Sequence, residues 1–600
     1  MKESGTAEDS LNSMLSSLYC RRWGLFYFSV WRLVMKTAKM TGARIVIETL
    51  IEQGITDVFG YPGSQVLDIY DELYKAGDRL HHYLTAHEQG AAHAADGYSR
   101  VTGKVGVVIA TSGPGATNLV TGIATAMLDS IPMVIITGNV ATSLIGRDSF
   151  QEINITGITM PITKHNYFVS DVNELADTIR EAFQIAKSGR PGPVLVDIPK
   201  DVQVAECEFA PVGIMPCFEQ HEASDSLIDE AVSMLNNAER PYIYIGGGAA
   251  GSDMTDSIIA LAEKIDAYIG CTFMGLSVIP TAYERFLGMQ GMHGLYASSM
   301  ANREADVILG VGVRFSDRAT GNLSDYAPHA KIIQLDTDLA EINKNVQVDV
   351  GIIGNIVSSF MRIMMRCEKR FHPDWTDQIN AFKAKGREIR KIAEATMGSG
   401  ISPKTLFDHI NEIKTNDTVI STDVGQHQMW TAQYVRFAEP RRFASSGGLG
   451  TMGYGLGASI GAHIGSGSRV VLITGDGSFG MNLNELATAV TYNIPVTIIV
   501  MNNGVLGMVH QWQTYFYDKR YSATSLAARK TDFVKVAEGF GLPGKKVSTI
   551  DEFRSAFSEG YAHEGPFLID AVIDSDELVL PMMPPGGAGD DIITLRSDNY

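Results

Sequence analysis

Cysteine and positive charge are both scarce in this 600-residue chain, and each shortage excludes a class of protein. The five cysteines include no C-x-x-C pair, so they predict neither a disulfide framework nor a zinc site and indicate a reducing, cytoplasmic compartment. The formal net charge of -19 argues against a general nucleic-acid or anionic-membrane partner. The remaining composition, 45% hydrophobic and 20% charged, is that of an ordinary globular protein.

The N-terminus also lacks an apolar run of membrane-spanning length, although residues 1–40 are unusual. The stretch WGLFYFSVWRLV is interrupted by Arg32 and is too short to cross a bilayer. Glu3, Glu8 and Asp9 fit neither a signal peptide nor a transit peptide. We expect residues 1–40 to be a non-core extension, with a membrane-surface anchor as the alternative.

Apolar strand patterns alternate with helical patterns, which predicts an α/β fold of three doubly wound parallel-sheet domains. The length of the chain favours three or four domains. We place the domains at residues 41–205, 222–366 and 400–575, followed by a tail at 576–600. The Pro- and Gly-containing tail would lie over another surface, with disorder as the alternative.

The first and third domains share a pattern that predicts an ancient duplication. Each runs strand, Gly-x-Gly, helix, Ile-Pro, strand and Asn, in VGVVIATSGPGATNLVTGIATAMLDSIPMVIITGN and in VVLITGDGSFGMNLNELATAVTYNIPVTIIVMNNG. The interval from Gly113 to Pro132 nearly equals that from Gly475 to Pro495. Only the second copy carries Asp476 and an Asn pair, so only that copy should bind a metal ion.

The most informative motif is Gly475-Asp476-Gly477 followed by Asn502-Asn503. Both parts follow predicted strands, where ligands of open α/β sheets bind. Glycines let the backbone approach a phosphate, while the Asp476 carboxylate and the Asn503 amide oxygen are hard ligands suited to Mg2+. The pattern resembles the diphosphate–Mg2+ motif of thiamine-diphosphate (ThDP) enzymes, with a generic phosphate loop as the alternative.

Glu88 begins a predicted helix in HEQGAAHAADGYSR, after the predicted strand HHYLTA. Taken alone, it is an ordinary first-turn glutamate favoured by the helix dipole. ThDP chemistry needs one carboxylate in a dry site, which hydrogen-bonds the aminopyrimidine ring and favours its imino tautomer. Because the metal motif is also present, we interpret Glu88 as that carboxylate.

Many further motifs follow in order along roughly residues 41 to 590. They include YPG, HEQGAAHAADGYSR, TSGPGATNLVTGIATAMLDSIPM, RPGPVLVDIPKD, GMHG, RFSDR, DVGQHQMW, GGLGTMGYGLGA and NNGVLGMVHQWQ. Together they resemble the catalytic subunits of the acetohydroxyacid synthase (acetolactate synthase) family. The resemblance implies decarboxylating condensation of pyruvate with pyruvate to 2-acetolactate, or with 2-ketobutyrate to 2-aceto-2-hydroxybutyrate. This is the first common step of valine, leucine and isoleucine biosynthesis.

The resemblance also implies roles for individual residues. The metal ligands would be Asp476, Asn503 and the carbonyl of Val505. The ThDP contacts would come from Glu88, Gln426, His427, Gly450, Met452, Gly475, Gly477 and Ser478. Catalysis and the substrate channel would involve Glu88, Phe150, Gln151, Lys164, Met508, Val509 and Trp512. For Met508 and Trp512, plain core packing is the alternative.

The middle domain resembles one that binds FAD, which would be structural because the reaction needs no net redox change. The implied FAD contacts are Arg190, Gly246, Gly247, Gly248, Met292, His293, Gly294 and Arg318. For the glycine run, a tight strand-to-helix turn is the alternative. Glu88 and Asp476 lie in different copies of the duplicated unit, so the family implies a homodimer or tetramer with shared sites, together with a regulatory small subunit.

Some residues depart from the family pattern. Ser64-Gln65 stands where Gly-Ala is usual, close to the reacting carbon, and Ala141 stands where a proline is usual. Arg147 adds a charge near Phe150. These departures leave acceptor preference and inhibitor sensitivity open.

Three alternatives remain. Another ThDP-dependent carboligase or hydrolase would keep Glu88 and Asp476 and change the channel residues. A flavin-free catabolic synthase would lack RFSDR. A non-enzymatic relative would lack Glu88 or Asp476. The chain has RFSDR and both carboxylates.

Overall fold

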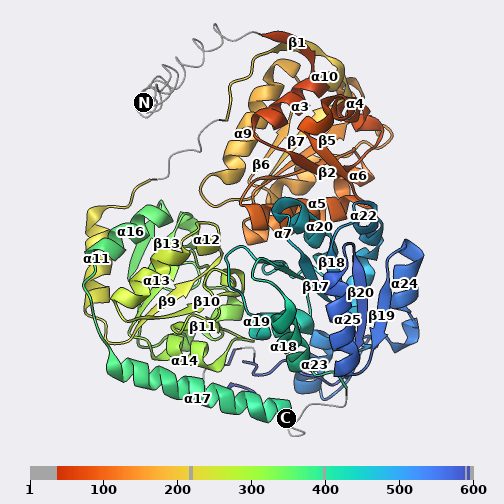
Figure 1. The fold of residues 1–600 in the computed structure, drawn as a ribbon. Helices are drawn as coiled ribbons and strands as arrows, with labels where there is room; N and C mark the ends of the chain where they lie inside the picture. The colour runs from red at the N-terminus through yellow and green to blue at the C-terminus, as the bar shows by residue number, and fades with distance from the viewer. Residues whose placement is uncertain (1–36, 215–220, 396–399, 585, 588–590, 595–600) are drawn as a thin grey trace, which may run out of the picture.

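The computed structural model describes residues 37–214, 221–395, 400–584, 586–587 and 591–594. Most of the expected N-terminal extension and part of the expected tail lie outside the described residues. The described chain forms three lobes, each built on one six-stranded parallel sheet flanked by helices (Figure 1). The α/β fold class predicted from the sequence is therefore confirmed.

The N-terminal domain has the strand order β3-β2-β4-β5-β7-β6. Strands such as GVVIA and MVIITGN are buried throughout, as expected for a parallel sheet with helices on both faces. The strands are β2 (Asp57–Tyr61), β3 (His81–Leu84), β4 (Gly106–Ala110), β5 (Met133–Asn139), β6 (His165–Phe168) and β7 (Pro193–Pro199). The helices are α3 (Gly42–Glu52), α4 (Leu67–Ala76), α5 (Glu88–Thr102), α6 (Pro114–Thr117), α7 (Val120–Asp129), α8 (Ile155–Thr159), α9 (Leu175–Lys187) and α10 (Lys200–Val204). A separate antiparallel ladder pairs β1 (Ala38–Thr41) with β8 (Glu206–Phe209).

The C-terminal domain has the strand order β16-β15-β17-β18-β20-β19. Its strands are β15 (Val419–Thr422), β16 (Phe443–Ser445), β17 (Val470–Gly475), β18 (Val496–Asn502), β19 (Gly544–Val547) and β20 (Phe567–Val572). Its helices are α18 (Pro403–Ile413), α19 (Gln426–Tyr434), α20 (Gly455–Ser466), α21 (Asp476–Asn482), α22 (Leu486–Thr491), α23 (Gly507–Phe516), α24 (Phe533–Phe540) and α25 (Ile550–Ala562). Counted along the chain, both terminal domains have the order 2-1-3-4-6-5, which supports the duplication.

The middle domain has a different order, β11-β10-β9-β12-β13-β14. Counted along the chain this is 3-2-1-4-5-6, the order of dinucleotide-binding sheets. The strands are β9 (Pro241–Ile245), β10 (Tyr268–Cys271), β11 (Phe286–Met289), β12 (Val307–Val311), β13 (Lys331–Asp336) and β14 (Val350–Ile353). The helices are α11 (Asp225–Asn236), α12 (Gly247–Ala250), α13 (Thr255–Lys264), α14 (Tyr296–Glu304), α15 (Asp317–Thr320), α16 (Ile356–Arg366) and α17 (Pro373–Ala395).

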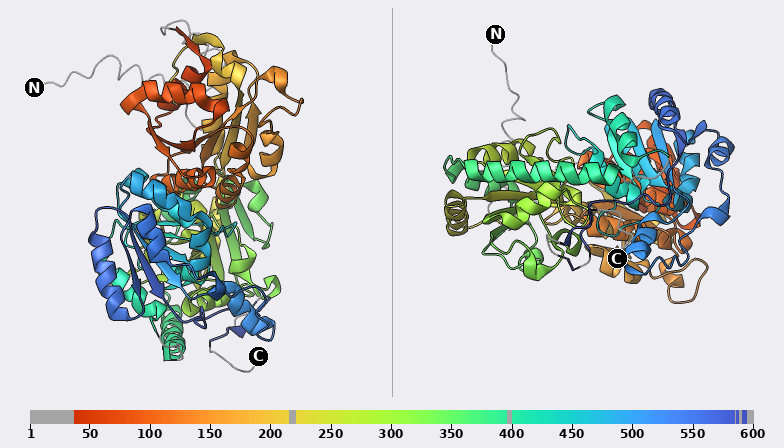
Figure 2. Two further views of the ribbon diagram at one scale, coloured as in Figure 1. Left: turned by 90° about the vertical axis from the view of Figure 1, so that its right-hand side faces the viewer. Right: turned by 90° about the horizontal axis from the view of Figure 1, so that it is seen from below.

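The two terminal domains pack through equivalent helices, α5 and α20, which occupy the same place in each copy. Glycines permit the close approach, since a Cβ at Gly461 would lie 1.7 Å from the Ala94 carbonyl oxygen. A Cβ at Gly97 would similarly lie 2.1 Å from the carbonyl oxygen of Ala458. Figure 2 shows the resulting stack of the N-terminal domain on the C-terminal domain.

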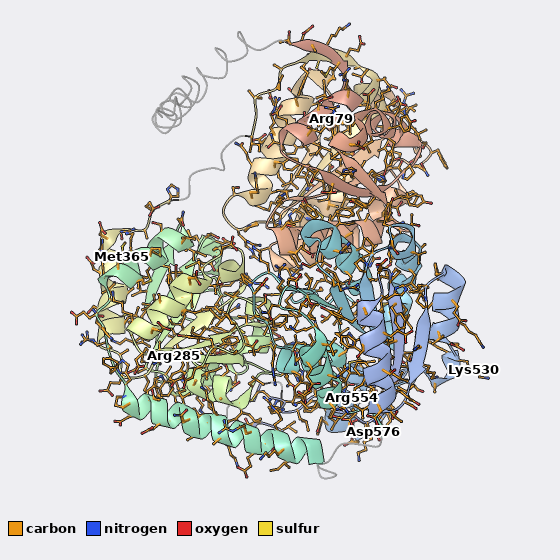
Figure 3. The ribbon with its side chains drawn as sticks, viewed as in Figure 1. Arg79, Arg285, Met365, Lys530, Arg554 and Asp576 are labelled. Carbon is orange, nitrogen blue, oxygen red and sulfur yellow. The ribbon has the colours of Figure 1, made fainter. Side chains whose placement is uncertain are left out.

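Arg79, Lys530 and Arg554, which Figure 3 labels, are examples of exposed charged side chains. Helix α17 runs along one side of the molecule from the middle domain toward the C-terminal domain. Within the described residues, no helix combines the length and apolar character needed to cross a bilayer.

Candidate active site

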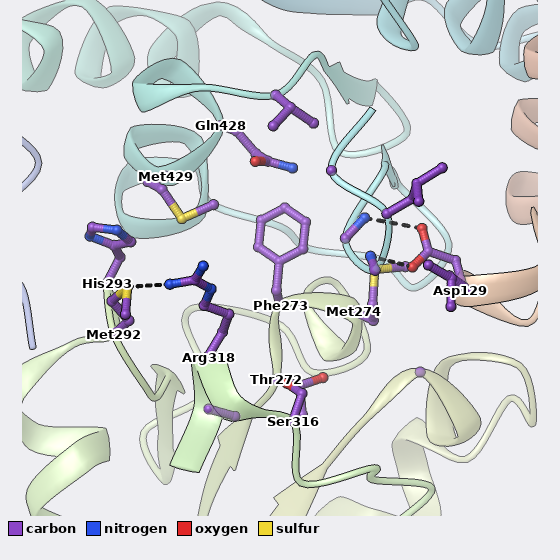
Figure 4. A pocket seen from close by; sticks show the side chains of 18 of the residues that line it. Asp129, Thr272, Phe273, Met274, Met292, His293, Ser316, Arg318, Gln428 and Met429 are labelled. Carbon is purple, nitrogen blue, oxygen red and sulfur yellow. Dashed lines mark hydrogen bonds between the residues drawn. The ribbon is translucent and has the colours of Figure 1, made fainter. Parts of the chain in front are cut away.

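A cavity of about 1900 Å3 lies where the three domains meet. Single-ligand pockets measure about 300–1,000 Å3, so this cavity has room for more than one cofactor-sized molecule. Figure 4 shows side chains of several domains converging on it, among them Asp129, Phe273 and Gln428.

The predicted metal motif lies on the wall of this cavity. Strands β17 and β18 are paired neighbours, and they bring Asp476 and Asn503 to adjacent positions at their carboxyl ends. The Gly504 N–H donates to Asp476 Oδ2 at 3.1 Å, and the Val505 N–H donates to Asn503 Oδ1 at 3.2 Å. Burial raises the pKa of Asp476 to about 6.

One carboxylate, one amide oxygen and one carbonyl suit a cation that also binds phosphate oxygens, as Mg2+ does. No cluster of three His, Cys, Asp or Glu side chains suited to a metal occurs in the described part of the chain. The backbone next to Asp476 is closely surrounded, because a Cβ at Gly477 would lie 2.7 Å from Leu506 and one at Gly475 would lie 3.0 Å from His427 Nδ1. The donor set therefore fits Mg2+ with a diphosphate.

Helix α19 supplies Gln426 and His427 to the same wall. Gln426 donates to Gln511 Oε1 at 2.9 Å and to the Glu577 carbonyl at 2.7 Å, and it accepts from Asn503 Nδ2 at 3.2 Å. Burial lowers the pKa of His427 to about 3, so the ring is neutral. Its Nε2 has no protein partner, which leaves a buried polar atom available to a ligand.

The Glu88 region is a second, separate cluster on the N-terminal domain. Glu88 is the first residue of α5 and is 9% exposed. Its Oε2 accepts from Asn118 Nδ2 at 3.0 Å, and a Cβ at Gly115 would lie 3.2 Å from its Oε1. Glu88 is not among the residues that line the cavity. Within one chain, the structure thus does not bring Glu88 and Asp476 to a common wall.

Gln151 and Phe150 also belong to the N-terminal domain and do not line the cavity. Gln151 adopts a left-handed φ of 63° and accepts from Ser64 Oγ at 3.3 Å. Phe150 is 81% exposed. Lys164 donates to the carbonyls of Ile185 and Ser188 and does not line the cavity, and burial lowers its pKa to about 8.

The remaining channel residues lie on α23, and Met508, Val509 and Trp512 all line the cavity. Trp512 lies under the Arg318 guanidinium at 5.5 Å, a cation–π contact between the C-terminal and middle domains. Arg318 also donates to Met292 Sδ at 3.3 Å. Trp512 also packs against a hydrophobic cluster formed by Tyr515, Leu580, Met582 and Ile593. It therefore has a packing contact in addition to its cavity face.

The FAD candidates line the cavity in all but one case. Gly294 does not line it, and a Cβ at Gly294 would lie 2.5 Å from the backbone of Gln290. Gly246 and Gly248 pack against the backbone of Gly312, so a side chain at either position would prevent this close approach of two segments. Gly247 has only Met274 nearby. Met292 and His293 form part of the wall, as do Arg190 and Arg318.

Two further FAD candidates are polar groups with defined surroundings. Burial lowers the pKa of His293 to about 4, and its Nδ1 has no protein partner. Arg190 donates to Ser130 Oγ at 2.8 Å and to Glu341 Oε1 at 2.7 Å, which joins the N-terminal and middle domains.

Two cavity residues were given no role from the sequence: Glu341 lies in no quoted motif, and Asp129 lies within TSGPGATNLVTGIATAMLDSIPM without an assignment of its own. Asp129 is the last residue of α7, where the helix dipole disfavours a negative charge. That unfavourable position is a signal that the carboxylate has partners outside its own helix.

Comparison with known proteins gives three family matches. The models described as the N-terminal TPP binding domain, the central domain and the C-terminal TPP binding domain of thiamine pyrophosphate enzymes match residues 40–158, 228–363 and 423–571. The probable acetolactate synthase large subunit of Methanocaldococcus jannaschii is 43% identical, over 91% of this chain and 94% of that protein.

Two bacterial proteins are similar over almost the same span. The acetolactate synthase large subunit of Haemophilus influenzae is 41% identical, over 92% of this chain and 98% of its own. The acetolactate synthase isozyme 2 large subunit of Escherichia coli is 41% identical, over 92% of this chain and 99% of its own.

Proposed function

The chain belongs to the acetolactate synthase large subunits of the thiamine pyrophosphate enzyme family, and on that premise we propose which of its residues carry the reaction. It is a ThDP-dependent acetolactate synthase of branched-chain amino acid biosynthesis. Bound ThDP supplies an electron sink that permits decarboxylation of a 2-ketoacid. We assign pyruvate as donor and pyruvate or 2-ketobutyrate as acceptor.

Asp476, Asn503 and the Val505 carbonyl would hold Mg2+, and through it the diphosphate. One observation carries this assignment. The neighbouring strands β17 and β18 both end at the cavity, and these three residues follow closely after their carboxyl ends. The unpartnered His427 Nε2 and the backbone at Gly475 and Gly477 would contact the diphosphate oxygens. Bound Mg2+ would stabilise Asp476 as a carboxylate, against the effect of burial.

Glu88 would hold a proton at the aminopyrimidine ring of the cofactor. Because it does not line the cavity of its own chain, we assign it to the site of a second chain. The loop at residues 141–152 exposes Leu144, Ile145 and Phe150, an apolar surface suited to burial by a partner subunit. A homodimer with shared sites follows, in which Gln151 and Phe150 orient the substrate and exclude water.

FAD would occupy the part of the cavity formed by the middle domain. The strand order 3-2-1-4-5-6 and the unpartnered His293 Nδ1 support a dinucleotide there. FAD would be structural, since carboligation transfers no net electrons to an acceptor. The names of the Haemophilus and Escherichia relatives as large subunits support a small-subunit partner for this chain as well.

The test is the product formed by the purified chain with pyruvate, Mg2+, ThDP and FAD. We expect 2-acetolactate and CO2, and mixed product when 2-ketobutyrate is added. A redox-inactive FAD analogue should sustain the same rate. Acetaldehyde or acetate as the sole product would contradict carboligation, and a strict need for flavin turnover would contradict the structural role of FAD.

A further inference from the structure

The segment that follows β16, here called the glycine loop (residues 447–453), forms one wall of the cavity. Gly447, Gly448, Gly450 and Met452 all line it. Gly450 and Gly453 have left-handed φ values of 71° and 85°. A loop this rich in glycine has high conformational entropy when free, so its single conformation requires support from outside the loop.

Asp129 of the N-terminal domain also lines the cavity and hydrogen-bonds this loop (Figure 4). Its Oδ1 accepts from the Gly448 N–H at 2.7 Å, and its Oδ2 accepts from the Gly447 N–H at 3.0 Å. A Cβ at Gly448 would lie 2.9 Å from Asp129 Oδ1, so the backbone can approach the carboxylate only at a glycine. Charge-assisted bonds of this length are among the stronger hydrogen bonds in proteins.

Arg100 holds the Asp129 carboxylate in turn. Arg100 donates to Asp129 Oδ2 at 2.8 Å and to Asp96 Oδ1 at 2.5 Å, and all three side chains are buried. Tyr454, the residue after the loop, donates its hydroxyl to Asp96 Oδ1 at 2.6 Å. Two carboxylates share one guanidinium, so the network keeps a net negative charge that the loop N–H groups help to offset.

Helix α7 makes a second contact one turn before Asp129. Thr125 Oγ1 lies 2.7 Å from Thr451 Oγ1, and both side chains are buried. Residues four apart lie on the same face of a helix, so one face of α7 holds both the start and the end of the loop.

We propose that Asp129 is a positioning residue that fixes the glycine loop in the conformation that receives ThDP. The proposal rests on the function proposed above, in which Gly450 and Met452 of this loop contact the cofactor. If the loop moved away, the buried Asp129 carboxylate would lose two of its hydrogen-bond donors and keep only Arg100, and leaving a buried acceptor without a donor is costly. The loop is therefore held before the cofactor arrives, so that binding does not bear the cost of ordering it.

The test variant is Asp129→Asn, which keeps the size of the side chain and removes its charge. Equilibrium dialysis of ThDP against cofactor-stripped protein, with saturating Mg2+ and FAD, measures binding without activity. We expect the dissociation constant for ThDP to rise about 10- to 100-fold, as for loss of hydrogen bonds to a charged group. At saturating ThDP, kcat for 2-acetolactate should stay within about threefold of wild type, because no reacting group has changed.

Asp96→Asn is the matched control, since it perturbs the same buried network without a hydrogen bond to the loop. It should lower Tm and leave the ThDP dissociation constant within about twofold of wild type. Folded Asp129→Asn protein that binds ThDP as wild type does would overturn the proposal. So would a loss of ThDP affinity as large in Asp96→Asn as in Asp129→Asn.

Thr125→Val provides a second, milder test that does not disturb buried charge. It should raise the ThDP dissociation constant about two- to tenfold, the effect of losing one neutral hydrogen bond. If Asp129→Asn does not fold, this variant decides: unchanged ThDP binding in Thr125→Val overturns the proposal. If the wild type binds ThDP but forms no 2-acetolactate, only the proposed reaction fails. The dialysis measurement then still tests the role of Asp129 in ThDP binding.

Discussion

At the scale of single residues, burial determines the charge state of the groups around the cavity. His427 and His293 are neutral because desolvation lowers the pKa of each ring to about 3 and about 4. Asp476 is the reverse case, since burial raises its pKa to about 6 in the absence of a cation. Neutral imidazoles and one carboxylate that needs a counter-ion are compatible with a site for a metal diphosphate.

Replacing Glu88 with Gln keeps the hydrogen bond from Asn118 and removes the ionisable carboxyl group. We expect kcat for 2-acetolactate to fall about 10²–10⁴-fold, as for other acid–base groups. ThDP should still bind, because Asp476 and Asn503 are unchanged. Steady-state rates and ThDP dialysis of the variant measure both quantities, with Asn118→Ala as a control for the hydrogen bond alone. A near-normal kcat in Glu88→Gln would show that Glu88 is an ordinary first-turn glutamate.

Asp197 provides a pH prediction away from the cavity. It accepts from Thr137 Oγ1 at 2.7 Å and from Asn139 Nδ2 at 2.6 Å, yet burial raises its pKa to about 7. An unfolded chain releases this proton near about pH 4. The folded protein therefore binds the extra proton between these values, and this group's contribution to stability is lost as pH rises through the window.

In Asp197→Asn no proton is released, so the Tm of the variant relative to wild type should rise from pH 4.5 to pH 7.5. The free energy of unfolding of the variant relative to wild type should change by on the order of 1 kcal/mol per pH unit. Thermal unfolding of both proteins in matched buffers measures it, and Thr137→Val controls for loss of the hydrogen bond without loss of the carboxyl group. A Tm difference that is flat across this range would mean that Asp197 is ionised throughout.

At the scale of secondary-structure elements, α23 connects the metal site to the channel. It begins at Gly507, four residues after Asn503, and it carries Trp512, whose ring lies under Arg318. The helix thus presents Met508 and Trp512, which are four residues apart, to the cavity, while His510 is buried on another face. Helical periodicity therefore accounts for both the channel role and the packing role of this segment.

Replacing Trp512 with Leu should reduce the preference for 2-ketobutyrate over pyruvate and leave 2-acetolactate formation active. One methylene in an apolar pocket is worth about 10–200-fold in selectivity, which sets the scale of the change. Competition between the two acceptors, with both products quantified, measures the ratio. Phe516→Leu is the control, because Phe516 contacts the Trp512 ring at 5.4 Å without lining the cavity. An unchanged product ratio would assign Trp512 to packing alone.

At the scale of the whole molecule, the two halves of the proposed site lie in different domains: Glu88 in the N-terminal domain and Asp476 in the C-terminal domain. Asp476 lines the cavity of its own chain, whereas Glu88, the first residue of α5, does not line it. A closed twofold assembly would satisfy both halves at once, because each chain would supply Glu88 to one site and Asp476 to the other.

This arrangement predicts complementation between inactive chains. Glu88→Ala and Asp476→Ala should each be inactive alone. After subunit exchange in equal amounts, hybrid dimers should each contain one intact site, restoring about one quarter of the wild-type activity. Mass spectrometry of differently tagged chains verifies the exchange. Verified hybrids without activity would contradict a site shared between subunits.

Local patterns in the sequence were sufficient to predict the architecture and to single out the motif that we assign to the metal. Buried strands such as GVVIA and VVLITG are continuous apolar runs, and their order with intervening helices indicates parallel sheets whatever the distant contacts are. The spacing of Asp476 and Asn503 is likewise local, since each residue follows one of two successive strands. The roles assigned to the individual site residues remain predictions.

Only the tertiary structure decided which residues share a wall and which hold that wall in place. The contact of Asp129 with Gly447 and Gly448 joins residues that are far apart in the chain, and it depends on how two domains dock. The placement of Glu88 outside the cavity, and of Lys164 against two backbone carbonyls, arises in the same way. Periodicity reports which face of an element is buried, whereas the partner across a domain boundary is set by packing between surfaces that no local pattern specifies.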